Sequence, residues 1–238
     1  MAEKLKKFIE TLKKTHNIEI KVRRSIYRRS SYTIRVFPNL DVVIYVPFYF
    51  TQKGVISAIS TNLSWIKDRL KYYRSIRYEY SIYKKIPFLG EDIKICFYKR
   101  KTFKLEENTL FIPEKYKNDE EKLKKAIIRW YKREFKKILK ERLDYYSKKM
   151  GLKYNKFYLI ESFYKWGSCN CITRNLRFHW RLVMMPIFII DSVVVHELTH
   201  LIEKSHSKKF WAIVYRYFPE YKKSDKYLKK ITHKLYFI

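Results

Sequence analysis

A short apolar segment at residues 193–202 constrains the fold more than any other part of this 238-residue chain. It contains His196 and His200, and a spacing of four residues places two side chains on the same face of an α-helix. The residues around them are almost all apolar: Val193, Val194, Val195, Leu198, Leu201 and Ile202. A helix that is apolar on nearly every side is buried in a core. The segment therefore predicts a buried helix, and it disfavours a surface helix that the two histidines merely cap.

Two imidazoles on one helix face can bind a single Zn²⁺, so this helix is a candidate metal site. Glu197 follows the first histidine, where its carboxylate can take a proton from a metal-bound water. Zinc lowers the pKa of such a water to about 7, and the carboxylate base then completes a hydroxide nucleophile. The sequence thus predicts a zinc-dependent peptidase, with His196 and His200 as metal ligands and Glu197 as the general base.

A catalytic zinc has three protein ligands and leaves its fourth position to water, so a third ligand is needed. His206 is the first candidate, but ten residues along a continuous helix would carry it about 15 Å away and turn it by about 80°. The helix must therefore end near residues 203–205, and Ser205 or Ser207 would cap a following helix. Glu220 is the second candidate, at the spacing that a thermolysin-like site uses for its glutamate. Pro219 indicates that Glu220 lies beyond the end of that following helix.

Several short motifs follow one another along the C-terminal half in a specific order. They are WGSC at 166–169, residues 175–182, Pro186, the HELTH motif at 196–200, HSKKFW at 206–211 and PEYK at 219–222. In this combination the sequence resembles the YgjP-like metallopeptidases, which are relatives of the SprT-like proteins. A looser similarity covers Arg28-Arg29, residues 42–47 and residues 64–66.

This resemblance implies a minimal zincin core in which His196, His200 and His206 bind zinc and Glu197 is the catalytic base. It therefore favours His206 over Glu220 as the third ligand. The sequence departs from the family pattern at Lys165, where an arginine usually precedes the WGSC tryptophan.

The pattern of the chain predicts an α+β fold in two parts. A hydrophobic content of 47% and an aromatic content of 18% are those of a chain that folds, and four glycines with six prolines leave little room for a flexible linker. Residues 1–117 are expected to form a mainly β region with an intervening helix. Residues 118–238 are expected to form the zincin-like core, with a long helix at 118–150, a small antiparallel sheet, the active-site helix from Pro186 and a further helix.

The net charge is the second strong feature of the sequence. Fifty-four basic against 23 acidic residues give a formal charge of +31, which suits a polyanionic partner such as nucleic acid or an anionic membrane. An AT-rich genome would produce a similar composition without functional cause. Tracts at 21–32 and 71–85 mix basic residues with tyrosine, which fits phosphate contact with base stacking and fits solvated turns equally well. By analogy with the SprT branch, a DNA-proximal peptidase is a further alternative, as is a nucleic-acid-binding module with a structural or vestigial metal site.

The cysteines and the apolar runs bear on compartment. Cys96, Cys169 and Cys171 are too few for a disulfide framework, which indicates a reducing compartment. The longest apolar run has nine residues, against about 20 for a membrane-spanning helix, so we expect a soluble, cytoplasmic protein. The two cysteines at 169 and 171 are expected to pack rather than to bind zinc. Tyr215 and Arg181 are candidates for stabilising an oxyanion.

Overall fold

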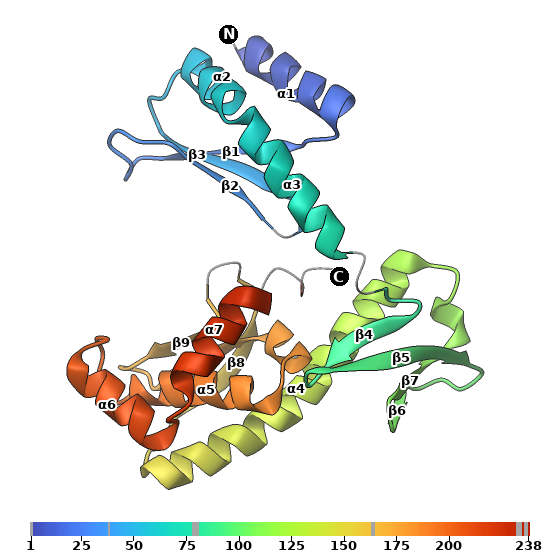
Figure 1. Ribbon diagram of the computed structural model, residues 1–238, viewed down its shortest axis with the longest axis vertical. Coiled ribbons are helices and arrows are strands. Elements are labelled where there is room, and N and C mark those ends of the chain that lie inside the picture. The colour runs from blue at the N-terminus through green and yellow to red at the C-terminus, as the bar shows by residue number, and fades with distance from the viewer. Residues whose placement is uncertain (1, 38, 78–80, 163–164, 232–234, 236–237) are drawn as a thin grey trace. The chain divides into compact units, whose positions relative to one another are not determined.

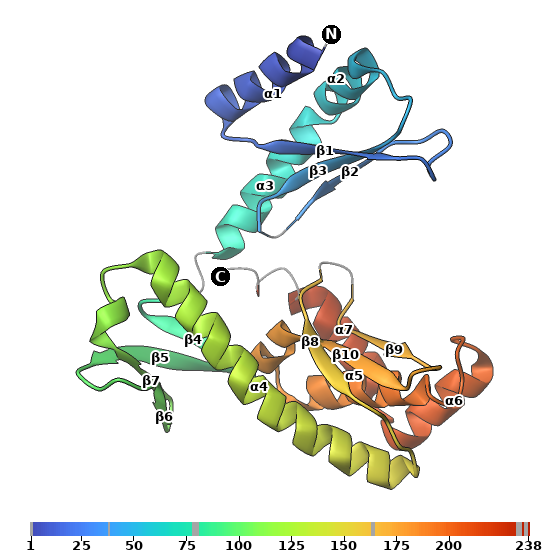
Figure 2. The same cartoon turned by 180° about the vertical axis from the view of Figure 1, so that it is seen from behind.

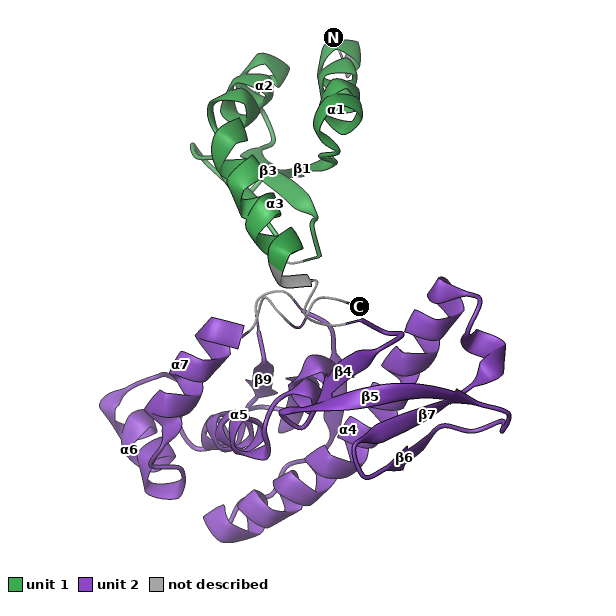
Figure 3. Ribbon diagram, turned by 45° about the vertical axis from the view of Figure 1, so that its right-hand side comes forward, with its two compact units in different colours: residues 1–79, 237 green, residues 80–236, 238 purple. Residues whose placement is uncertain are grey.

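The computed structural model describes residues 2–37, 39–77, 81–162, 165–231, 235 and 238 (Figure 1). Clustering of contacts divides the chain into two compact units, residues 1–79 and residues 80–236 (Figure 3). The described residues form seven α-helices and three small sheets, so the fold class is α+β as predicted. None of the helices in the described part of the chain combines the length and apolar character needed to cross a membrane.

The first unit packs three helices on one face of a small sheet. In chain order its elements are α1 Ala2–His16, β1 Ile20–Ser25, β2 Thr33–Val36, β3 Val42–Pro47, α2 Gln52–Thr61 and α3 Leu63–Arg77. The strand order is β1-β3-β2, with β3 parallel to β1 and antiparallel to β2. Thr51 caps α2 by accepting a hydrogen bond from the Gly54 amide, as its sequence position predicts. With three helices beside the strands, this region contains more helix than the mainly β pattern we expected.

The second unit begins with a four-stranded sheet that packs on the long helix α4 Glu120–Met150. The strands are β4 Lys85–Phe88, β5 Glu91–Tyr98, β6 Lys104–Glu106 and β7 Thr109–Pro113, in the order β4-β5-β7-β6. A short 3₁₀ turn, η1 Glu114–Tyr116, leads into α4. The Tyr131 hydroxyl of α4 donates a hydrogen bond to the Pro87 carbonyl at 2.6 Å. The ring centroids of Phe88 and Trp130 are 5.0 Å apart. These contacts join residues 80–117 to the C-terminal part, whereas the sequence pattern placed a division after residue 117.

Helix α4 ends at residue 150, as expected, and begins at Glu120, two residues later than expected. Asp119 accepts a hydrogen bond from the Lys122 amide at the N-terminus, and Gly151 takes the left-handed conformation, with φ 67°, at the C-terminus. Its buried stripe contains Leu123, Ile127, Trp130, Tyr131, Phe135, Leu139 and Leu143. This stripe packs against α5 Ile187–Thr199 and the 3₁₀ turn η2 Trp180–Met184.

A third sheet lies beside α5 and consists of β8 Phe157–Ile160, β9 Gly167–Asn170 and β10 Asn175–His179 (Figure 2). Its order is β8-β10-β9, and β10 is parallel to β8 and antiparallel to β9. The expectation of an antiparallel sheet was therefore wrong for one of its two strand pairs. The sequence pattern did not predict strand β9. The chain forms β8 and then β9 at the two edges of the sheet, and β10 returns between them. Strand β10 therefore runs parallel to β8 and antiparallel to β9.

Two helices follow the active-site helix. Helix α6 is Lys208–Tyr217 and helix α7 is Tyr221–Ile231. The first corresponds to the predicted further helix, and Ser207 caps it through the Phe210 amide. The second has no counterpart in the sequence prediction.

Candidate metal centre

Helix α5 holds the first two candidate ligands inside the core. It begins after Pro186, and ten of its residues are buried, including Val193, Val194 and Val195. Asp191, one turn before the motif, accepts two hydrogen bonds from the Arg142 guanidinium of α4, at 2.6 and 2.7 Å. This bidentate pair fixes α5 against α4. The predicted buried helix is confirmed.

The chain reverses after α5 and returns His206 to the helix. Helix α5 ends at Thr199, earlier than the expected 203–205, and α6 begins at Lys208, so the helix stops before His206 as its spacing required. The Nε2 atom of His206 lies 3.0 Å from the Nε2 atom of His196. One nitrogen from each of His196, His200 and His206 lies within 4.8 Å of the others, and this group could hold a metal ion.

The remaining ring nitrogens of the α5 histidines have partners of their own. The Nδ1 atom of His196 is 2.9 Å from the Tyr221 hydroxyl, and the Nδ1 atom of His200 is 3.1 Å from the Glu203 carbonyl. Such partners orient metal-binding imidazoles and leave Nε2 for the ion. Two nitrogens bound to a tetrahedral Zn²⁺ at about 2.0–2.1 Å are about 3.3 Å apart, close to the 3.0 Å observed between the His196 and His206 nitrogens. The donor set therefore fits a divalent ion that accepts three imidazoles.

Burial keeps the imidazoles of His196 and His200 neutral, the form that binds metal. Burial lowers the pKa of His196 to about 3, and the neighbouring rings of His200 and His206 add to the effect. Burial likewise lowers the pKa of His200. A neutral ring offers a lone pair at neutral pH without first losing a proton.

Glu197 is buried beside the histidines without a partner for one of its oxygens. The residue is 5% exposed, and Oε2 has no hydrogen-bond partner among the described residues. Burial raises the pKa of its carboxyl to about 8, and the charge of Lys165 acts in the opposite direction. A buried carboxylate that lacks a hydrogen-bond partner and has a raised pKa is a candidate for binding a ligand or exchanging a proton.

Strand β9 comes close to this carboxylate at Gly167. A β-carbon at position 167 would lie 2.6 Å from Oε1 of Glu197 and 2.7 Å from its Cγ. Only glycine fits this approach. Any side chain at position 167 would therefore displace the Glu197 carboxylate.

A cavity of about 630 Å³ opens over the site. Its lining includes the three histidines, Glu197, residues 167–169 of β9, and Tyr221. Cys169 and Cys171 also line it, and the Cys171 thiol lies 3.1 Å from the His200 carbonyl, so these cysteines pack beside the site.

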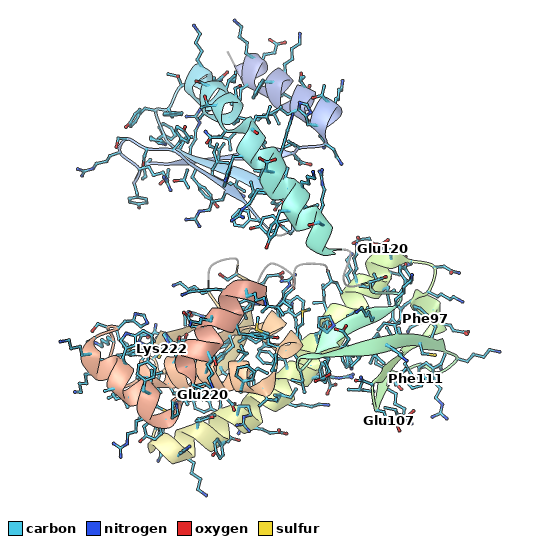
Figure 4. All side chains as sticks on the ribbon, in the orientation of Figure 1. Phe97, Glu107, Phe111, Glu120, Glu220 and Lys222 are labelled. Carbon is cyan, nitrogen blue, oxygen red and sulfur yellow. The ribbon has the colours of Figure 1, made fainter. Side chains whose placement is uncertain are left out.

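The other residues singled out in the sequence lie elsewhere. Glu220 is exposed at the junction of α6 and α7 (Figure 4), where its carboxylate accepts a hydrogen bond from Lys223, and it is not part of the histidine cluster. It lies beyond the end of α6, as Pro219 indicated. Arg181 is buried between Glu161 and the carbonyls of Leu235 and Ile238, outside the cavity lining. The residue that sequence reasoning missed is Tyr221, whose only signal was its place in the PEYK motif.

Comparisons with known proteins agree with this geometry. No curated protein matches the chain. The model of the family described as YgjP-like, metallopeptidase domain matches residues 30–231, a stretch that includes the helix α5, the histidine cluster, Glu197 and Gly167. Because this match covers most of the sequence, the chain belongs to the YgjP-like metallopeptidase family.

Proposed function

We propose that this protein is a zinc-dependent peptidase in which His196, His200 and His206 hold the metal and Glu197 is the general base. The observation that carries the proposal is the buried Glu197 carboxylate, which lacks a partner for Oε2 and follows directly on one of three clustered histidines. A structural metal site has no need of an unpaired buried carboxylate, because burying such a group is costly. A hydrolytic site needs one to move a proton.

The residues of the site have separate roles in peptide hydrolysis. When bound, the ion would supply Lewis-acid chemistry, polarising the scissile carbonyl and lowering the pKa of a water. Glu197 would accept the proton of that water and later deliver it to the leaving amine. Burial raises the pKa of this carboxyl, which suits its role as proton donor to the leaving amine, whereas the charge of a bound divalent ion would lower it and favour the carboxylate that acts as the base. Tyr221 would keep the His196 ring oriented through Nδ1.

Strand β9 supplies a surface for an extended peptide. It is at the edge of its sheet, paired with β10 on one side, and residues 167–169 line the cavity. The free edge of a strand can pair with an added strand through backbone hydrogen bonds. A peptide bound in this way would pass beside Glu197, because Gly167 is the point of closest approach.

Zinc is the metal that the donor set favours, since imidazole nitrogens in a tetrahedral arrangement suit it. The three cysteines are free thiols, which supports a reducing compartment and thus a cytoplasmic protein.

The test is hydrolysis of a peptide library by the purified protein and by its Glu197→Gln variant. We expect wild-type protein to contain about one zinc per chain and to cleave peptides. The variant should keep the metal and lose at least about a hundredfold in kcat, the contribution of a general base. Equal activity in the two proteins would contradict the role of Glu197. Full metal content with no hydrolysis by wild-type protein would favour the alternative of a structural or vestigial site.

A further inference from the structure

The sheet of the first unit has two faces of opposite character. Side chains alternate along a strand, and those of Ile20, Val36, Val42, Ile44 and Val46 belong to the core that α1, α2 and α3 cover. The strand register places the alternate residues together on the other face: Lys21, Arg23, Thr33, Arg35, Val43 and Tyr45. The helices of this unit leave that face uncovered (Figure 2). We call these six residues the open sheet face.

The open sheet face carries Lys21, Arg23 and Arg35 and no acidic side chain. Residues 20–67, which contain the three strands and their loops, have eight basic side chains and one acidic side chain, Asp41. That carboxylate is already paired with Lys21 at 3.0 Å. The net charge per residue of this stretch is close to that of the whole chain, with 54 basic against 23 acidic residues, so what distinguishes the stretch is its scarcity of acidic side chains. Arg23 and Arg35 are both exposed.

Aromatic rings lie among these charges. Tyr45 is on the central strand, and the guanidinium carbons of Arg28 and Arg35 are each 5.9 Å from its ring centroid. Four exposed residues follow the ends of β1 and β3, and we call them the aromatic tip: Ile26, Tyr27, Phe48 and Tyr49, with 73%, 90%, 66% and 67% of their surface exposed.

The aromatic tip is held in place by the backbone around it. The two strands are parallel, so their ends lie together, and the Phe48 amide donates a hydrogen bond to the Ser25 carbonyl. The Arg24 guanidinium donates to the carbonyls of Phe48 and Phe50, at 2.8 and 2.7 Å. These bonds fix the loop after β3 in an arrangement that leaves its rings in solvent. Exposed rings on a fixed loop are preorganised for contact with a ligand.

We propose that the open sheet face and the aromatic tip bind single-stranded nucleic acid. Arg23 and Arg35 would contact phosphates, and unpaired bases would stack on Tyr27, Phe48 and Tyr49. Single strands offer both chemistries at once, because their phosphates are closely spaced and their base faces are accessible. A duplex hides its base faces and would leave the rings without a role. An anionic lipid surface would engage the tip alone and leave the charges around Tyr45 unused.

The test measures binding of fluorescent oligothymidylate and oligouridylate of about 15 nucleotides to the full-length protein by anisotropy at several salt concentrations. Arg23→Gln/Arg35→Gln should weaken binding to both and reduce the slope of log K against log salt by about 1.4, the value for two phosphate contacts. Tyr27→Ser/Phe48→Ser should weaken binding at least about fivefold with little change in the slope. If these variants lose more affinity for the uridylate than for the thymidylate, RNA is the preferred strand.

The matched control is Lys6→Gln/Lys14→Gln, which removes the same charge from exposed positions of α1. It should leave affinity within about twofold, because screening weakens charges that do not touch the strand. An equal loss in this control would overturn the proposal, since binding would then follow net charge alone. So would an absence of binding by wild-type protein at low salt, or binding to anionic vesicles but not to oligonucleotide.

The experiment is independent of the peptidase proposal. The Glu197→Gln variant should bind the oligonucleotide as wild-type protein does, because Glu197 belongs to the second unit and the open sheet face to the first.

Discussion

The site contains buried residues in arrangements that are rare in an ordinary hydrophobic core. Glu197 is 5% exposed with an oxygen that has no partner in the described part of the chain. Gly167 gives it room, and the hydroxyl of Tyr221 orients the ring of His196. The unpaired buried carboxylate costs stability, and such a cost is understandable where chemistry needs the group. Two predictions belong to this scale.

The first prediction concerns Gly167. Gly167→Ala would bring a methyl group to 2.6 Å from Oε1 of Glu197, so the carboxylate must move. We expect peptidase activity to fall at least about tenfold, because displacement of a general base by about 1 Å is costly. Metal content should stay at the wild-type value, since the histidines are not displaced. Ser168→Ala, one residue further along β9, is the control and should retain activity; equal losses in the two variants would count against a specific contact with Glu197.

The second prediction separates the two candidate third ligands. His206→Ala should reduce zinc affinity by a factor of about 100 or more, because it removes one of three protein ligands. Glu220→Ala should leave zinc affinity unchanged, because Glu220 is exposed and bonded to Lys223. Metal content after dialysis against a chelator measures both. Loss of zinc in Glu220→Ala with retention in His206→Ala would reverse our assignment.

Secondary-structure elements bring these residues together from distant parts of the sequence. Helix α5 supplies His196, Glu197 and the start of the turn that returns His206, while β9 supplies Gly167 and α7 supplies Tyr221. Helix α4 supports α5 from behind through the pair Arg142–Asp191. Burial raises the pKa of Asp191, and Arg142 opposes that effect. The position of the site helix therefore depends on a buried ion pair.

The third prediction tests this pair. Arg142→Met would leave the Asp191 carboxylate, 9% exposed, without its cation. Breaking a buried pair from one side costs about 3–5 kcal/mol, and we expect about 3 kcal/mol because Arg142 is partly exposed. Urea denaturation measures the free energy of unfolding.

The control for this prediction is the double variant Arg142→Met/Asp191→Leu. Replacing both charges by apolar groups should recover most of the loss, because no uncompensated charge remains. A double variant that is as unstable as the single one would show that packing, rather than the charge, is responsible.

At the scale of the whole molecule, the two units carry different chemistry. The histidine cluster, Glu197 and the cavity belong to residues 80–236, whereas the open sheet face belongs to residues 1–79. The net charge of +31 therefore has a different role in each unit. The site depends on buried, mostly neutral groups, whereas guanidinium groups of the sheet are exposed to solvent. Global stability also has a group that responds to acid, His179, which is fully buried.

The fourth prediction is a loss of stability in acid that depends on His179. Burial, assisted by the charge of Arg181, lowers the pKa of this ring to about 4, below the value of about 6.5 in an unfolded chain. Between these values the unfolded state binds more protons, so the free energy of unfolding falls as pH falls. The contribution is fully present above about pH 6.5 and is lost towards pH 4, and we expect about 2 kcal/mol of loss between about pH 7 and pH 5.

The matched variant for this prediction is His179→Asn. Its side-chain oxygen can still accept the Arg181 amide hydrogen bond that Nδ1 accepts, but it does not titrate. Denaturation in the presence of a chelator removes the contribution of metal binding, and the acid loss that comes from His196 and His200 is common to both proteins. An acid loss of the same size in the variant and in the wild-type protein would assign the effect to other groups.

The features that depend on neighbouring residues along the chain could be predicted from the sequence. Apolar flanks predicted that α5 is buried, and Ser207, one of two candidate caps, predicted where α6 begins. The spacing between His196 and His206 predicted that the helix must end between them. Each of these follows from backbone geometry over a few residues. The resemblance to the YgjP-like family, carried by ordered motifs, is confirmed.

The contacts between distant segments became visible only in the folded chain. Strand β9 has no strong alternation of apolar residues, so its pairing with β10, and the parallel direction of β8 that follows from it, were missed. The approach of Gly167 to Glu197, 30 residues apart, and the contact of Tyr221 with His196, 25 residues apart, leave no periodic trace in the sequence. Local patterns encode which face of an element is buried, whereas the partner that covers that face is selected by packing of the whole chain.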